Sequence, residues 1–165
     1  MSESHDLPAV DRITVGTIGA VGERTFLLQA AQGPEQVTLK MEKAQVAALA
    51  QYLGKLLEGL PRPGHLPEAL EVDVSEEPAW VVGTLGLAYD QEEDRVLLVA
   101  DEAVGEDEVG ATARFGATRE QVAALAIRGT QLVEAGRPPC PLCGYPLDPS
   151  GHVCPRTNGF RPPKL

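Results

Sequence analysis

The chain has 165 residues, of which 43% are hydrophobic and only 4% aromatic, and its formal net charge is −10. This length suits one or two small domains, with a core built mainly from Val, Leu and Ala. No run of about eighteen apolar residues occurs, and residues 1–11 are polar and acidic, so the sequence predicts neither a membrane span nor a signal peptide. We therefore expect a cytoplasmic protein.

The chain begins with a leader, residues 1–11, that we expect to be disordered. A first half over residues 12–60 follows, in which apolar residues alternate in three short runs and then recur at helical spacing from Val46 to Leu60. This pattern predicts three strands and a helix. The residues expected on the core side of the strands are Ile13, Val15, Thr17, Phe26, Leu28, Ala30, Val37, Leu39 and Met41.

A second half over residues 80–136 repeats the first. The string Gln45–Ala50 recurs letter for letter as Gln121–Ala126, and Val15–Gly19 returns with one change as Val82–Gly86. The spacing between copies grows from 67 to 76 residues, and insertions are expected in turns rather than in strands. The turns that would hold the additional residues are Asp90–Asp94 and Asp101–Gly110.

Capping and helix-breaking residues mark the ends of the two expected helices. Thr118 with Gln121 three residues later is a capping box for the second helix, and Gly136 would end it. The first helix would stop at Pro61–Gly64. We assign residues 61–79, which contain four prolines and several acids, to a linker between the halves.

The tail, residues 137–165, contains all three cysteines and one histidine within fifteen residues. Cys140 and Cys143 have the two-residue gap of a zinc turn, and His152 with Cys154 completes a tetrahedral set. Four protein ligands leave no open position for water or substrate, so the pattern predicts a structural zinc site. A catalytic zinc that had lost one ligand, and a redox dithiol of the first two cysteines, are the less favoured alternatives.

Charge divides the chain into an acidic body and a basic tail. Residues 1–136 carry ten Lys and Arg against 23 Asp and Glu, for −13, whereas residues 137–165 carry four against one, for +3. An acidic body repels phosphate backbones, so appreciable nucleic-acid binding is not expected. A basic protein partner would meet the acidic runs Glu71–Glu77 or Asp101–Glu108, although such runs are also typical of solvated loops.

Other motifs for chemistry are lacking in the sequence. The glycine-rich stretch Val15–Gly22 leads into Arg24 and a strand pattern rather than a helix, so it predicts a hairpin turn and not a phosphate loop. Serine occurs at only four positions, and none lies in a nucleophile elbow. The acidic runs lack the spacing of a calcium-binding loop.

Several strings together resemble a known family. They are Val15–Gly19, Arg24–Gln29, Glu42–Val46, Val82–Gly86, Ala135–Gly144 and Gly151–Gly159. The set is similar to the domain-of-unknown-function 3090 family, found mainly in actinobacteria. The resemblance implies a bacterial cytoplasmic protein whose genes often lie beside phosphomutase-like and phosphoinositide-kinase-like neighbours, and it brings no established activity.

The sequence thus predicts an α+β protein of two related β-β-β-α halves with antiparallel sheet and a C-terminal zinc-binding tail, and the two halves could join about a pseudo-twofold axis. Two classes of function remain. The first is a non-enzymatic protein-interaction or ligand-binding module. The second is an enzyme or nucleotide-handling protein that acts with phosphate-processing partners, its site lying between the halves. The missing nucleophile, phosphate loop and open metal site favour the first.

Overall fold

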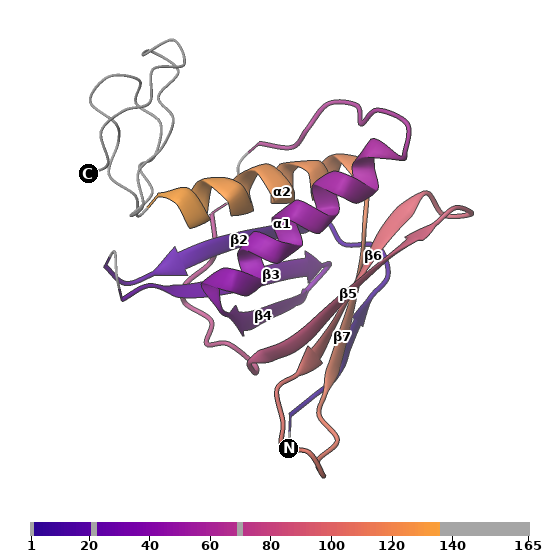
Figure 1. Cartoon of the computed structure of the whole chain (residues 1–165). Coiled ribbons are helices and arrows are strands. Elements are labelled where there is room, and N and C mark those ends of the chain that lie inside the picture. Colours follow the sequence, from indigo (N-terminus) through magenta and orange to yellow (C-terminus); the bar gives the residue numbers. More distant parts are fainter. Residues whose placement is uncertain (1, 21–22, 69–70, 136–165) are drawn as a thin grey trace, which may run out of the picture.

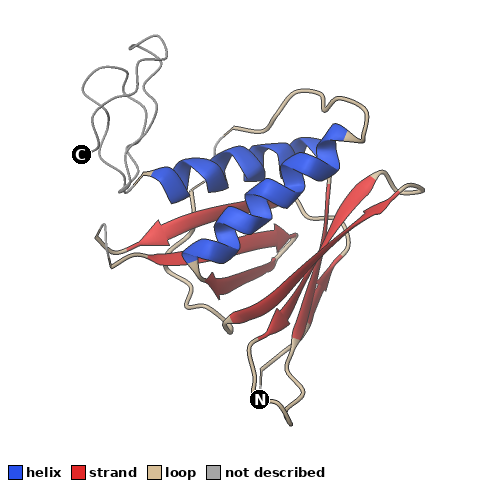
Figure 2. Ribbon diagram, viewed as in Figure 1, coloured by secondary structure: helices blue, strands red, loops and turns tan. Residues whose placement is uncertain are grey.

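The computed structural model describes residues 2–20, 23–68 and 71–135, and it has an α+β architecture (Figures 1 and 2). Two helices lie on one side of a three-stranded sheet, and a four-stranded sheet extends away from them (Figure 1). Neither described helix is long and apolar enough to cross a membrane. The elements are β1 (His5–Leu7), β2 (Arg12–Ile18), β3 (Thr25–Gln32), β4 (Glu35–Met41), α1 (Lys43–Glu58), β5 (Val82–Asp90), β6 (Arg95–Glu102), β7 (Thr112–Ala117) and α2 (Arg119–Glu134).

Each half contributes three consecutive antiparallel strands and then a helix, as the periodicity predicted. The first sheet has the order β2-β3-β4, and the second has the order β1-β7-β6-β5. The inward-facing side chains of both sheets and the apolar faces of both helices form one continuous core. Fully buried members include Leu28 and Leu39 in the first half and Leu98 and Phe115 in the second.

Strand pairing fixes which residues of the two halves are equivalent. Ile13 pairs with Ala30 in the first sheet, and Leu85 pairs with Ala100 in the second. When residues with equivalent pairing partners are matched throughout, the residues of β2, β3 and β4 correspond to those 72, 70 and 76 positions later in β5, β6 and β7, respectively. The duplicated β-β-β-α order is therefore present in the structure, with a register that differs from the one the sequence indicated.

The repeated string at the start of each half gave the wrong alignment of the first strands. Val15 corresponds to Leu87 rather than to Val82, and Val82 lies beyond a β-bulge that interrupts the regular pairing of β5 with β6. The turn Asp90–Asp94 consequently holds no additional residues, which corrects that expectation. The additional residues of Asp101–Gly110 are confirmed, since the counterpart of this loop is the tight turn between β3 and β4.

The segment before each first strand joins the sheet of the other half. β1 pairs in parallel with β7, and Val81, just before β5, pairs in parallel with Lys40 of β4. The expectation that residues 1–11 are disordered is therefore wrong for the described part of that segment. Leu7 and Val10 are buried in the core, and their pairing partners lie more than a hundred residues away along the chain.

The two helices pack directly against each other at Gly129 of α2, whose missing side chain leaves room for Val46 and Ala50 of α1. The predicted capping box is present. The backbone N–H of Gln121 donates to Thr118 Oγ1 (3.1 Å), and the Gln121 side chain accepts from the backbone N–H of Thr118. Gln45 occupies the same place in α1. The predicted end at Gly136 lies outside the described residues.

The repeated glutamine also joins the halves. Gln45 Nε2 donates to the carbonyl of Val82 (2.9 Å), and Gln121 Nε2 donates to the carbonyl of Val10 (3.0 Å). Each helix start thereby holds the exchanged segment of the other half. The glutamine that opens each repeated string therefore both caps its own helix and binds the segment of the other half.

The linker covers the outer face of the first sheet in its second part, residues 71–77. Val72 lies against Gly16, and Arg12 Nη2 donates to the carbonyl of Glu71 (2.7 Å). Gln29 at the centre of this face is fully buried and bonds the backbone of Asp73 through both ends of its amide. We call residues 71–77 the strap.

Candidate functional site

The four predicted zinc ligands, Cys140, Cys143, His152 and Cys154, lie outside the described residues, so the zinc site stays a prediction. Among the residues that the structure describes, no three His, Cys, Asp or Glu side chains gather as metal ligands. The candidate sites in the described chain are therefore a pocket, a groove and a loop.

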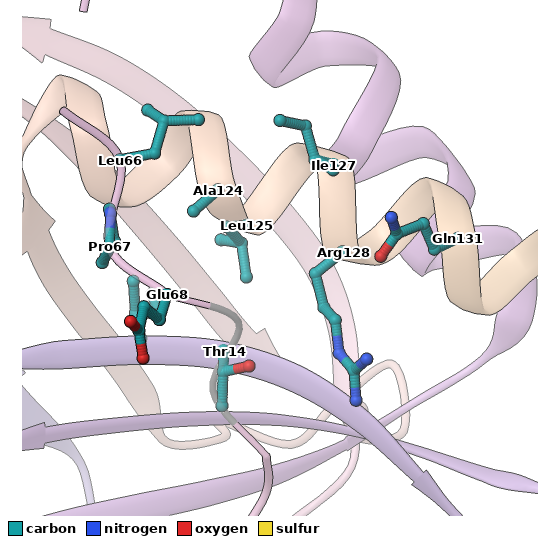
Figure 3. Close-up of a pocket in the computed structure, with 10 residues that line it drawn as sticks. Thr14, Leu66, Pro67, Glu68, Ala124, Leu125, Ile127, Arg128 and Gln131 are labelled. Atoms are coloured by element: carbon teal, nitrogen blue, oxygen red, sulfur yellow. The ribbon is translucent and has the colours of Figure 1, made fainter. Parts of the chain in front are cut away.

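The pocket lies between α2, β2 and the first part of the linker, where the two halves meet (Figure 3). It has a volume of about 200 Å³, smaller than the usual range for drug-sized ligands. It therefore fits a few heavy atoms or one side chain of a partner. Its lining residues are Ile13, Thr14, Leu66, Pro67, Glu68, Ala124, Leu125, Ile127, Arg128 and Gln131.

Polar groups of both charges border this pocket. Arg128 extends from α2 toward β2 and its Nε donates to the carbonyl of Val15 (3.4 Å), while Glu68 approaches from the linker (Figure 3). Ile13 and Leu125 supply apolar surface. The described residues of the lining include no His, Cys or Lys, so they can hold a small ligand or side chain but provide no acid–base pair around a nucleophile.

A groove of about 580 Å³ runs over the outer face of the second sheet. Leu97 of β6 is half-buried in it, and three carboxylates and two guanidinium groups border it. The mixed charges suit a peptide segment better than a single anion. The lining residues are Asp6, Pro8, Ala9, Asp90, Glu93, Arg95, Leu97, Arg114 and Gly116.

The loop between β6 and β7, residues 103–111, exposes acidic and apolar side chains together. Val109 is 100% exposed and Val104 is 41% exposed, and the three residues Glu106–Glu108 between them are acidic and exposed. Hydrogen bonds hold the base of the loop. Glu102 Oε1 accepts from the amide of Ala111 (3.0 Å), and this backbone bond, with the Ser2 hydroxyl, holds the pKa of Glu102 below its usual value.

A second charged cluster fastens the turn between β5 and β6 to α2. Asp94 accepts from Arg119 through both of its oxygens (3.0 and 3.2 Å) and from the Tyr89 hydroxyl (2.6 Å). The Arg119 bond is the main cause that lowers the pKa of Asp94, and the Asp94 bond in turn raises the pKa of Tyr89. Arg119 also donates to the carbonyl of Pro61 (2.6 Å), so we interpret this cluster as a structural clasp.

The described histidines and serines form no catalytic arrangement. His5 Nδ1 lies 3.3 Å from Glu35 Oε2, across the two sheets. The hydroxyl of Ser75 donates to Asp73 within the strap.

Sequence reasoning missed the pocket and the clasp because each joins residues far apart along the chain. Arg128 was a lone charge on a helix, and Asp94 and Arg119 are separated by 25 residues. In the structure Asp94 has a left-handed conformation (φ 51°), which is typical of an Asp in a tight turn. The strap was assigned to the linker, and its contact with the first sheet was not foreseen.

Comparison with known proteins identifies a family but no function. A family model described as a protein of unknown function (DUF3090) matches residues 5–154. No curated protein matches the chain. No solved structure matches it either. Because the family match covers most of the sequence, this chain belongs to the DUF3090 family of proteins of unknown function.

Proposed function

We propose that this protein is a non-enzymatic interaction module of the cytoplasm, which holds a structural zinc in its tail and binds a basic protein partner through the loop of residues 103–111. The observation that carries the proposal is this loop. It exists in only one of the two halves, and it exposes three consecutive carboxylates between two exposed valines. Loops on a rigid scaffold are common places for recognition.

The partner chemistry follows from charge. A body at −13 attracts a basic protein and repels a phosphate backbone, and such steering acts mainly on the association rate. In the acidic run Asp101–Glu108 the two carboxylates at the base accept hydrogen bonds within the chain, but Glu106–Glu108 on the loop are exposed, which favours the loop for this role. In the strap, by contrast, Asp73 and Glu76 accept hydrogen bonds from Gln36, so part of that acidic run already has partners within the chain.

The zinc ligands of the proposal are Cys140, Cys143, His152 and Cys154. Three thiolates and an imidazole suit a closed tetrahedral zinc site. In this role the metal fixes the fold of the tail and takes no part in a reaction. The purified chain should contain about one zinc, measured by inductively coupled plasma mass spectrometry, and Cys143→Ser should lose it. Full zinc occupancy in this variant would contradict the assignment.

The loop is tested with charge-reversal variants of the full chain. Tagged wild-type protein, used as bait in a cytoplasmic extract, should capture a basic protein, and Asp107→Lys with Glu108→Lys should abolish the capture. The matched control is Glu58→Lys with Glu92→Lys, which changes the net charge equally at two exposed sites away from the loop. Equal capture by both double variants would contradict the proposal, as would capture of RNA or DNA in place of a protein.

The pocket between α2 and β2 favours a second candidate, the binding of a small ligand at the junction of the halves. Arg128 and Glu68 border a mainly apolar space, so a small molecule with one cationic and one anionic group fits best. Thermal-shift screening of amino acids and small zwitterions tests it. Stabilisation by one of them in the wild type that is lost in Arg128→Gln would support this role.

A further inference from the structure

The outer face of the first sheet is covered by the chain itself. Across it the strap places Val72 against Gly16 and the backbone of Asp73 against Gln29. As a result Leu27 and Gln29, the two central residues of this face, are 1% and 0% exposed. The strap thus forms a third layer, which covers the face of the first sheet opposite the helices.

The equivalent face of the second sheet is open within the described chain. By strand pairing, Leu97 and Val99 stand where Leu27 and Gln29 stand in the first half, yet both are half-buried. Gly86, which pairs with Val99, has nothing within 4 Å of the position a side chain would take. The groove described above runs along this same face.

Chain order indicates which segment belongs on this face. The strap belongs to the segment that follows α1, the helix of the first half. The tail is the corresponding segment of the second half, because it follows α2. The linker reaches the other half at the start of α2, where the amide of Gly64 donates to Glu120 (2.7 Å). The end of α2 is likewise held by the other half, since Arg24 Nη1 donates to the carbonyl of Leu132 (3.4 Å).

Composition supports the same pairing. The tail is at +3, and Asp6, Asp90 and Glu93 border the groove together with two arginines. Apolar residues are spaced along the tail, as a segment that covers Leu97 and Val99 requires. They are Leu142, Tyr145, Leu147, Val153 and Phe160.

We propose that the tail, residues 137–165, docks across the outer face of the second sheet and covers Leu97 and Val99, as the strap covers Leu27 and Gln29. At 29 residues it is longer than the linker of residues 61–79, so it has the length to make the same crossing. The inference depends neither on zinc nor on the loop of residues 103–111.

Photo-crosslinking in the full chain tests the docking. The photoreactive residue p-benzoylphenylalanine is placed at Val99, and as a matched control at Val74, an exposed valine of the strap. After irradiation, mass spectrometry of the monomer band should find peptides of residues 137–165 joined to position 99 and not to position 74. Links between two chains only, or equal links from both positions, would overturn the proposal.

Hydrogen exchange gives a second readout that needs no crosslinker. Tail amides of the wild-type full chain should be protected, and Val99→Asp should speed their exchange about tenfold, as expected when an apolar contact is replaced by a buried charge. Val74→Asp is the control and should change nothing in the tail. Unprotected tail amides in the wild type, or equal effects of the two variants, would also overturn the proposal.

Discussion

Gln29 holds the strap on the first sheet, and replacing it tests how much this side chain contributes to the free energy of unfolding. Its Nε2 donates to Thr38 Oγ1 (2.8 Å) and to the carbonyl of Asp73 (3.0 Å), and its Oε1 accepts from the amide of Asp73 (2.9 Å) and from Arg12 (3.1 Å). Gln29→Met keeps nearly the same volume and removes all four bonds. The cavity contribution is therefore small, and the loss of hydrogen bonds dominates.

The expected loss of unfolding free energy is about 3 kcal/mol. Each hydrogen bond contributes roughly 1 kcal/mol net, and partners left without a bond in a buried place cost more, whereas the apolar thioether offsets part of the loss. For a chain of this size a loss of about 3 kcal/mol lowers Tm by roughly 6 to 12 °C.

Urea denaturation measures the free energy, and hydrogen exchange measures the strap directly, since the amide of Asp73 loses its acceptor. Gln51→Met is the matched control, because Gln51 lies exposed on α1 and its replacement should change stability by less than about 0.5 kcal/mol. An unchanged urea midpoint for Gln29→Met, with unchanged exchange in the strap, would refute the reasoning that this side chain fastens the segment.

Three further outcomes are expected. Gly116→Ala should cost about 2 kcal/mol or more, because its Cβ would meet the carbonyl oxygen of Pro8, whereas Gly54→Ala, at an exposed position of α1 with nothing within 4 Å, should not lower stability in the same urea titration. The pKa of Asp94 is lowered in the fold, so the stability it contributes is present above its ordinary pKa of 3.8 and is lost as the pH falls through the lower folded value. Asp94→Asn should therefore be less stable than the wild type at neutral pH, and the gap should close on acidification; a constant gap would contradict the assignment. Chelation of zinc should leave the far-UV circular dichroism of residues 12–135 intact, and global unfolding would show that the core depends on the tail.

The sequence predicted the elements whose pattern is local. The helix faces of α1 and α2 and the alternation in β2 and β3 came from apolar spacing, which directly reflects burial. The capping box of α2 was likewise legible, because both of its residues lie within one turn of helix.

The features that the sequence did not predict depend on distant contacts. β1 is too short to show a period of apolar residues, and it forms a strand because it pairs with β7 at the other end of the body. The first strands of the halves were misaligned because the bulge after Val82 lets Val82 and Leu85 both face the core although they are three residues apart. No local pattern signals such a bulge. The pocket and the strap are likewise set by long-range packing.

The exchange of β1 and Val81 between the sheets has a consequence for the origin of the fold. Each half completes its partner's sheet rather than its own, so a single β-β-β-α unit would leave an open edge beside β4 or β7. Two separate copies could satisfy each other only by trading these segments about a twofold axis. In the present chain the two copies are covalently joined, so this exchange is intramolecular and does not depend on protein concentration.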